Sequence, residues 1–201
     1  IGYVAPGVGR VWGPLFDLIG FTPALEVAQA LANRVGAHNV GESQGDGEVV
    51  AAVESPTLVE RLELMMKNSD NVYAEAIGRE VALRRSTTDA PGATMEVLAA
   101  HGFDTAATTI HDNSGLSELN RITPRLLSSV FAVAAAQEEG PDTAALRPLL
   151  SALPVAAADG TLAERYGDLP GRGWVRAKTG TLDGTASLAG TVTSVNGNVY
   201  T

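Results

Sequence analysis

The sequence predicts one mixed α+β domain in which helices precede an antiparallel sheet. Apolar residues recur with helical spacing in several segments between residues 22 and 153. From Gly173 onward they alternate with polar residues, as in half-buried strands. The 201 residues, 45% of them apolar, are enough for a single domain with its own core. We therefore expect helices packed on an antiparallel sheet, with no internal repeat or linker.

The expected helices begin at capping patterns. Thr22-Pro23 places a capping side chain before a proline at the first helical position, and predicts a helix to about Val35 that ends at a left-handed Gly36. Ser55-Pro56 repeats the pattern and predicts a second helix, which ends at Lys67. The remaining helices are expected over residues 72–85, 92–100, 124–134 (after Thr123) and 142–153.

The expected strands lie mainly at the C-terminal end. A short strand is possible at residues 49–53, and the alternating segments after Gly173 predict a meander. Gly184 and Asn196-Gly197 fall at the turns, and Asn-Gly between alternating segments is a strong indication of a hairpin. We interpret residues 1–20 as an irregular lead-in from an upstream region.

Composition excludes several classes of function. The formal net charge of −9 lacks the basic footprint of nucleic-acid binding, so no nucleic-acid partner is expected. The chain has no Cys, and its three His residues are far apart, so neither a metal nor a cofactor is expected. No apolar run approaches the roughly 20 residues that span a bilayer, so no transmembrane segment is predicted.

Ser69-Asp70-Asn71 lies in the break between two predicted helices. Its ordinary interpretation is a helix end and an N-cap for the next helix, because Ser, Asp and Asn are the preferred capping residues. Capping does not exclude chemistry, since one residue can cap while its neighbours point into a cleft.

Lys178-Thr179-Gly180-Thr181 lies near the end of a predicted strand, and Lys178 is one of only two lysines. An ammonium attracts carboxylates and lowers the pKa of a neighbouring hydroxyl. Gly180 allows a substrate backbone to approach the strand edge, where backbone N–H groups can stabilise an oxyanion. Downstream of Ser-Asp-Asn, this pattern suits acyl transfer at a carboxylate-bearing substrate.

The two motifs are part of a longer likeness, in matching order, over residues 55–200. The chain resembles the low-molecular-mass penicillin-binding proteins of the D-Ala-D-Ala carboxypeptidase/endopeptidase type that carry large inserted domains. The segments that carry the likeness are Lys67–Glu75, Asp112–Ser117, Asn120–Pro124, Leu153–Ala156, Asp159–Leu162, Val175–Leu182 and Ser187–Gly190. The resemblance implies the serine β-lactamase/DD-peptidase-like fold, here incomplete, with residues 21–201 as the C-terminal part of the penicillin-binding catalytic domain.

The resemblance also implies roles for the matched residues. Ser69 would relay a proton between the nucleophile's lysine and the leaving group, and Lys178 would support the charge around it. Substrate binding would involve a further set, with the backbone N–H of Thr181 as half of the oxyanion hole. That set is Asn71, Thr179, Gly180, Thr181, Ser114 and Leu116.

The third motif of such enzymes, a nucleophilic Ser three residues before a Lys, is absent from the chain. Leu64 and Val175 stand three residues before the two lysines. We therefore expect an N-terminal segment or a separate chain to supply Ser-x-x-Lys. The loop at 112–118 also departs from the family's usual Asp-Gly-Ser-Gly-Leu-Ser-Arg, with Asn113 and Glu118 in place of Gly and Arg.

Three functions follow as alternatives. The first is part of a serine-type D-Ala-D-Ala carboxypeptidase/endopeptidase that forms an acyl-serine intermediate and is acylated by penicillins. The second is a β-lactamase or esterase of the same fold, and the third is a peptidoglycan-binding module without catalysis. The expected partners are stem peptides ending in D-Ala and β-lactam antibiotics, and the expected location is extracytoplasmic, in a bacterium.

Overall fold

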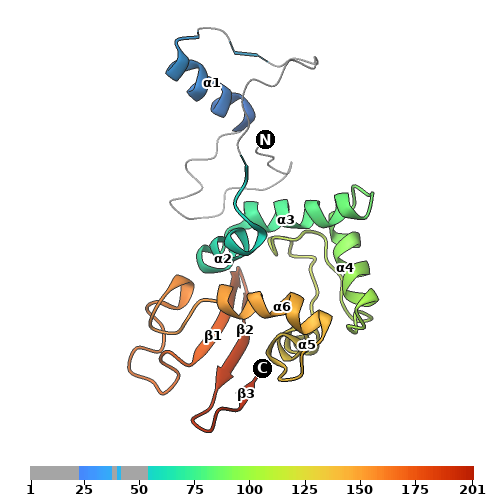
Figure 1. The fold of residues 1–201 in the computed structure, drawn as a ribbon, viewed down its shortest axis with the longest axis vertical. Coiled ribbons are helices and arrows are strands. Elements are labelled where there is room, and N and C mark those ends of the chain that lie inside the picture. Colours follow the sequence, from blue (N-terminus) through green and yellow to red (C-terminus); the bar gives the residue numbers. More distant parts are fainter. Residues whose placement is uncertain (1–22, 38–39, 42–53) are drawn as a thin grey trace. The chain divides into compact units, whose positions relative to one another are not determined.

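The computed structural model describes residues 23–37, 40–41 and 54–201 (Figure 1). The chain divides into two units, residues 1–55 and residues 56–201. In the first unit, α1 spans Pro23–Val35 and ends at Gly36 with a left-handed φ of 74°. Ala37 donates its N–H to the Ala32 carbonyl at 2.9 Å, so the predicted helix end is confirmed. The lead-in at 1–20, Thr22 and the possible strand at 49–53 lie outside the described residues.

The helices of the second unit agree with the predicted order. They are α2 (Leu58–Asn68), α3 (Asn71–Arg84), α4 (Ala90–Ala100), α5 (Pro124–Ala135), α6 (Pro141–Ala152) and the 3-10 helix η2 (Gly160–Leu162). α4 begins two residues before the predicted start. Thr123 caps α5 as predicted, because its hydroxyl accepts the N–H of Leu126 at 3.1 Å.

The predicted cap of α2 at Ser55 is wrong. The N-cap is Thr57, whose hydroxyl accepts the N–H of Glu60, while the Glu60 carboxylate accepts the N–H of Thr57 at 2.8 Å. This reciprocal capping box satisfies two N–H groups that the first turn of a helix leaves unpaired. Ser55 lies two residues too early to form it.

The sheet has three antiparallel strands in the order β1-β2-β3: β1 (Val175–Leu182), β2 (Thr185–Thr193) and β3 (Val199–Tyr200). Leu182 pairs with Thr185 around a two-residue turn that ends at Gly184, whose φ is 73°. The Asn196-Gly197 turn also forms, and the Gly197 N–H reaches the Ser194 carbonyl at 2.9 Å. Both predicted hairpins are confirmed.

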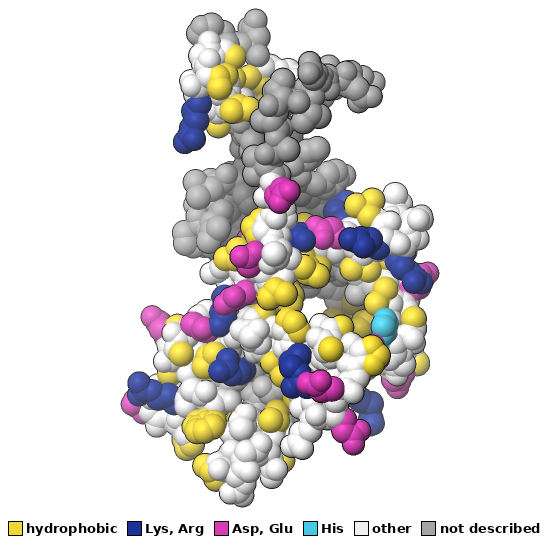
Figure 2. All heavy atoms as spheres, viewed as in Figure 1, with side chains coloured by type: hydrophobic (Ala, Val, Ile, Leu, Met, Phe, Trp, Pro, Cys, Tyr) yellow, Lys and Arg dark blue, Asp and Glu magenta, His cyan; other side chains and the backbone are white. Residues whose placement is uncertain are grey.

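The helices of the second unit pack on one another and on the sheet. α5 contacts α6 and β2, and α2 contacts α3, α6 and η2 (Figure 1). Leu153, directly after α6, and Leu162, the last residue of η2, have fully buried side chains. Each such burial contributes roughly 1.5–3 kcal/mol. On the face that Figure 2 shows, basic and acidic side chains are interspersed over the second unit. The fold class is therefore the mixed α+β architecture that the sequence predicts.

The segment after α6 pairs with β1 on the side opposite β2. Val155 bridges Arg176 in antiparallel fashion, and the Ala177 N–H reaches the Pro154 carbonyl at 3.0 Å. This pairing covers only the first part of β1. Backbone groups alternate between the two edges of a strand, so those of Thr179 and Thr181 face the same edge as those of Ala177, beyond the paired segment.

None of the helices in the described part of the chain combines the length and the apolar character that crossing a membrane requires.

Candidate active site

A direct hydrogen bond joins the two motifs that the sequence singles out. The Lys178 ammonium donates to the Ser69 hydroxyl at 2.7 Å, across 109 positions of the chain. Ser69 lies in the turn between α2 and α3, and Lys178 lies in the middle of β1. The tertiary structure thus places a cation next to a serine hydroxyl at the junction of the helical and sheet parts.

The α2–α3 turn fixes Ser69 by two features of its backbone. Ser69 has left-handed φ and ψ of 55° and 49°, a conformation that a serine adopts at some cost and that ends α2 sharply. Asp70 then caps α3, because its carboxylate accepts the N–H groups of Val72 and Tyr73, both at 2.9 Å. Capping and proximity to Lys178 therefore coexist in one triplet, on neighbouring residues.

The surroundings of Lys178 are partly buried and lower its proton affinity. Burial lowers the pKa of Lys178, because desolvation disfavours the charged form. An ammonium has three donors. One goes to Ser69 and a second to the Thr179 carbonyl at 2.6 Å. Since the Ser69 oxygen accepts from Lys178, the hydroxyl's own proton is available to a different acceptor.

The edge of β1 presents hydroxyls and backbone groups beside this pair. The Thr179 hydroxyl donates to the Thr161 hydroxyl at 2.9 Å. Thr181 is exposed, and its N–H faces the edge that β2 does not cover. A Cβ at Gly180 would lie 2.4 Å from the Ser187 hydroxyl on β2. Gly180 thus leaves room for a neighbouring side chain, a reason that differs from the substrate approach expected from sequence.

Asn71, Ser114 and Leu116 are less closely connected to the pair. Asn71 is the first residue of α3 and is half-buried. The Ser114 N–H is bound by Glu75 Oε1 at 2.9 Å, and the Ser114 hydroxyl accepts the Leu116 N–H at 3.3 Å. In the part of the chain that the structure describes, no hydrogen bond links these three residues to Ser69 or Lys178. Their roles in substrate binding stay predictions.

The loop at 112–118 is held by two carboxylates to which the sequence analysis gave no role. Glu75, on α3, accepts the N–H groups of both Asn113 and Ser114. Asp112 accepts the N–H of Gly115 at 2.7 Å and that of Ser117 at 2.6 Å. The Asn113 side chain, which departs from the family pattern, accepts a hydrogen bond from Thr94 at 2.8 Å. The loop is therefore tied to α3 and α4.

A second group of residues, to which the sequence alone gave no role, lies beside Ser69. The Lys67 ammonium forms an ion pair with Asp159, and Thr161 contacts Thr179. Burial would raise the pKa of Asp159, but the hydrogen bonds from Lys67 and Val155, with the charges of Lys67 and Arg176, together lower that pKa. The indication in the sequence was the Asp159–Leu162 segment of the family likeness.

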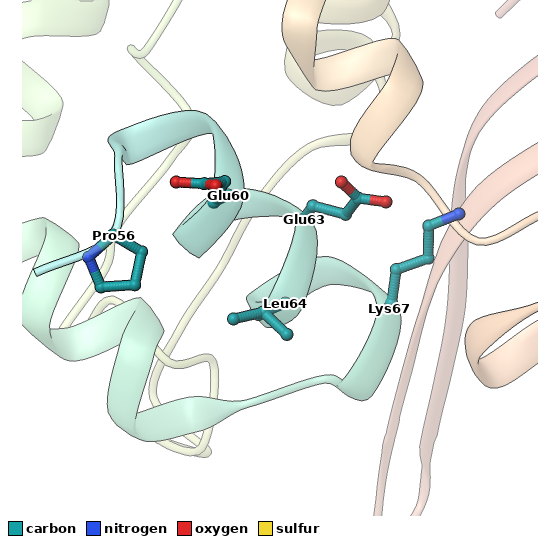
Figure 3. Close-up of a pocket in the computed structure, with 5 residues that line it drawn as sticks. All are labelled: Pro56, Glu60, Glu63, Leu64 and Lys67. Atoms are coloured by element: carbon teal, nitrogen blue, oxygen red, sulfur yellow. The ribbon is translucent and has the colours of Figure 1, made fainter.

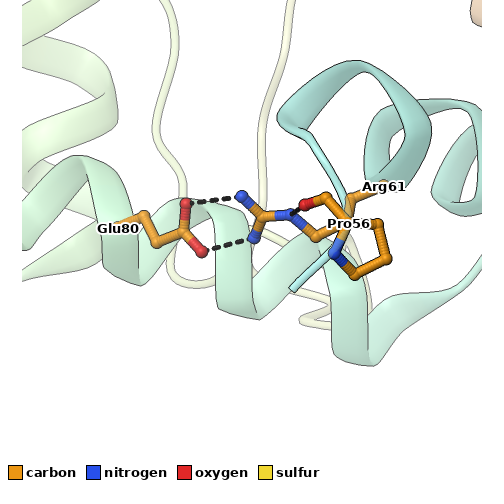
Figure 4. Close-up of polar contacts among 3 residues, drawn as sticks. All are labelled: Pro56, Arg61 and Glu80. Atoms are coloured by element: carbon orange, nitrogen blue, oxygen red, sulfur yellow. Dashed lines mark hydrogen bonds and ion pairs between the residues drawn. The ribbon is translucent and has the colours of Figure 1, made fainter. Parts of the chain in front are cut away.

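A shallow pocket follows the outer face of α2 (Figure 3). It is lined by Pro56, Glu60, Glu63, Leu64 and Lys67, and Lys67 extends from it towards the sheet. The pocket contains neither Ser69 nor Lys178. Near the start of the same helix, Arg61 forms a two-point ion pair with Glu80 of α3, with one contact at 3.0 Å, and donates to the Pro56 carbonyl (Figure 4).

No group of three or more His, Cys, Asp or Glu side chains that could hold a metal occurs within residues 23–37, 40–41 and 54–201.

Comparison with known proteins gives the family. The model of the D-Ala-D-Ala carboxypeptidase 3 (S13) family matches residues 22–201. The chain belongs to this family. It is 43% identical over 193 residues to the carboxypeptidase DacB of Mycolicibacterium smegmatis. It is 33% identical over 158 residues to the D-alanyl-D-alanine carboxypeptidase DacB of Haemophilus influenzae, covering 75% of this chain and 32% of that protein.

Solved structures agree with this assignment. Penicillin-binding protein 4 from Haemophilus influenzae, crystallised with a β-lactam, superposes with a TM-score of 0.73 at 29% identity, covering 88% of this chain and 42% of that one. The match to the mycobacterial DacB covers 90% of this chain and 41% of that protein. The chain therefore spans less than half the length of these relatives, and the predicted family and DD-peptidase-like fold are confirmed.

Proposed function

We propose that this chain forms the part of a serine-type D-Ala-D-Ala carboxypeptidase/endopeptidase that carries the Ser-Asp-Asn and Lys-Thr-Gly motifs. The observation that supports it most strongly is the 2.7 Å contact between Lys178 and Ser69. It joins the two motifs at a point where a strand edge can receive an extended peptide. The substrates would be peptidoglycan stem peptides ending in D-Ala, and β-lactams would acylate the same site.

The reaction would proceed through an acyl-serine. A serine of a Ser-x-x-Lys sequence elsewhere in the whole protein attacks the carbonyl carbon of the penultimate residue, and the C–N bond to the terminal D-Ala breaks. Ser69 passes its proton to the departing amine and regains one from the nucleophile side. Lys178 stabilises the negative charge that develops near Ser69 and attracts the terminal carboxylate. Water then releases the acyl group.

Substrate positioning would involve the β1 edge and the α2–α3 turn. The hydroxyls of Thr179 and Thr181 bind the terminal carboxylate. Gly180, between them, leaves room for the Ser187 side chain on β2 and carries no side chain that would obstruct the substrate backbone. The Thr181 N–H donates to the developing oxyanion, a type of contact that is worth about 3–4 kcal/mol in serine hydrolases. Asn71 binds a substrate carbonyl, and Ser114 and Leu116 line the cleft. A cell-wall substrate implies action outside the cytoplasm.

The test uses the full-length protein with a D-Ala-D-Ala peptide and a fluorescent penicillin. We expect D-Ala release and a covalent penicillin adduct, both greatly slowed in Ser69→Ala and Lys178→Ala. Rapid turnover of penicillin without a lasting adduct would instead indicate a β-lactamase. Reversible peptide binding with no adduct and no D-Ala release would indicate a binding module, and either result would overturn the proposal.

A further inference from the structure

The turn at Asp159–Thr161 contacts both parts of the proposed site. On one side, Asp159 pairs with Lys67, which is two residues before Ser69. On the other side, the Thr161 hydroxyl accepts a hydrogen bond from Thr179, which follows Lys178. The short helix η2 in this segment contacts both α2 and β1. The turn is therefore placed to set the spacing between the helix that ends at Ser69 and the strand that carries Lys178.

The contact with α2 involves backbone as well as charge. A Cβ at Gly160 would lie 2.9 Å from the Lys67 carbonyl oxygen and 3.1 Å from the Lys67 Cα, and Gly160 has a φ of 55°. Both features favour glycine there. Asp159 uses its second carboxylate oxygen to accept the N–H of Val155 at 2.7 Å. The last turn of α2 thus rests on the backbone of this segment and is fixed to it by an ion pair.

The segment that carries the turn is itself rigidly held. Leu153 and Leu162, on either side of it, have no exposed surface, and Pro154 is fully buried. The Ala156 N–H reaches the Val175 carbonyl at 2.9 Å, and the Ala177 N–H reaches Pro154. These bonds connect the turn to β1 directly before Lys178. Through this segment, a displacement of the turn would change the distance between Ser69 and Lys178.

We propose that Asp159 and Thr161 are positioning residues for the reaction, an inference that rests on the proposed function. Asp159, acting through Lys67, holds the end of α2 so that the Ser69 hydroxyl stays within hydrogen-bond reach of Lys178. Thr161 is hydrogen-bonded to Thr179 at 2.9 Å. A hydroxyl has a single proton, so when substrate binds, the Thr161 hydroxyl donates to the Thr179 oxygen and orients the Thr179 proton towards the substrate's carboxylate. A reacting group displaced by about 1 Å can lose on the order of a hundred-fold in rate, so small shifts at this turn are sufficient.

The first test compares single-turnover acylation of the full-length protein by penicillin in three variants. Asp159→Asn retains an acceptor for the Val155 N–H but loses the charge that Lys67 needs. We expect its acylation rate constant to fall by about ten- to a hundred-fold, with the labelled fraction of the protein unchanged. Lys67→Arg keeps the ion pair with Asp159, so it should retain most of the acylation rate constant of the unaltered protein.

The matched control is Glu80→Gln. This variant removes a different ion pair of α2, the one between Glu80 and Arg61 (Figure 4). Arg61 lies near the start of α2, about two turns before Ser69. We expect the rate constant of Glu80→Gln to stay within about two-fold of the unaltered protein. A purely structural role of Asp159 would lower the labelled fraction, or would slow Glu80→Gln equally. Either result overturns the inference, as does an unchanged rate in Asp159→Asn.

The second test separates Thr161 from Asp159. Thr161→Val should raise the KM for peptides with a free terminal carboxylate several-fold, leave KM unchanged for a matched ester or amide, and be rescued in Thr161→Ser. Equal effects on both substrates would contradict the role. If the unaltered protein is not acylated at all, the proposed function fails; if it is acylated and only the variants behave differently from expectation, the positioning role alone fails.

Discussion

Replacing Asp70 by Ala tests whether this residue serves as the cap of α3. The Asp70 carboxylate accepts the N–H groups of Val72 and Tyr73, both at 2.9 Å. Loss of an N-cap costs about 0.5–2 kcal/mol. Because Asp70 makes two hydrogen bonds through an ionised acceptor, we place the cost of its loss at the upper end of this range, about 2 kcal/mol. That energy corresponds to roughly 30-fold more frequent opening of the first turn.

The assay is native-state hydrogen exchange in the full-length protein. In Asp70→Ala, the amides of Val72 and Tyr73 should exchange about 30-fold faster. Asp70→Asn keeps an acceptor oxygen but loses the charge, so its exchange rates should increase much less. The amide of Leu126, capped independently by Thr123, is the internal control. Equal exchange of Val72 and Tyr73 in Asp70→Ala and in the unaltered protein would refute the capping role.

Three further changes test other parts of the structure. Burial lowers the pKa of Lys178, so the alkaline limb of kcat/KM should begin below the pH at which an exposed lysine titrates. Between the lowered pKa and the ordinary lysine pKa, Lys178 binds fewer protons in the folded protein than in the unfolded one, so the free energy of unfolding should rise with pH. An alkaline limb at the ordinary lysine pKa would contradict the burial of Lys178. Gly160→Ala should destabilise the protein by more than about 1 kcal/mol, because its Cβ would meet the Lys67 carbonyl at 2.9 Å; an unchanged urea midpoint would argue against this contact. Glu75→Ala should speed hydrogen exchange in the loop at 112–118 by about ten-fold or more, as two N–H groups lose a charged acceptor, and exchange at the original rate would count against it.

Local patterns in the sequence predicted most of the helices and strands, because each depends on neighbouring residues. The Thr123 cap, the Gly36 helix end and the two glycine-containing hairpin turns are of this kind. The misplaced cap of α2 shows where the approach fails. Ser55-Pro56 matches the pattern of a capping residue followed by proline. Thr57 is the N-cap instead, because Glu60 stands at the position that completes a capping box.

The site was only partly predictable. The Ser69–Lys178 contact could be expected because both residues lie in motifs that occur together. The Lys67–Asp159 pair joins residues 92 positions apart, and only the folded chain brings them together. Likewise, the Glu75 carboxylate accepts the N–H groups of Asn113 and Ser114, 38 and 39 positions further along the chain. Long-range contacts of this kind leave no local pattern.

The most direct test of the central claim is mass spectrometry of the full-length protein before and after treatment with a penicillin, followed by peptide mapping. We predict one acyl adduct, on a serine of a Ser-x-x-Lys sequence outside these 201 residues, formed much more slowly in Ser69→Ala and Lys178→Ala. An adduct on Ser69 itself would make Ser69 the nucleophile and contradict its role as proton relay. The absence of any adduct would contradict the assignment of this chain to an acyl-serine active site.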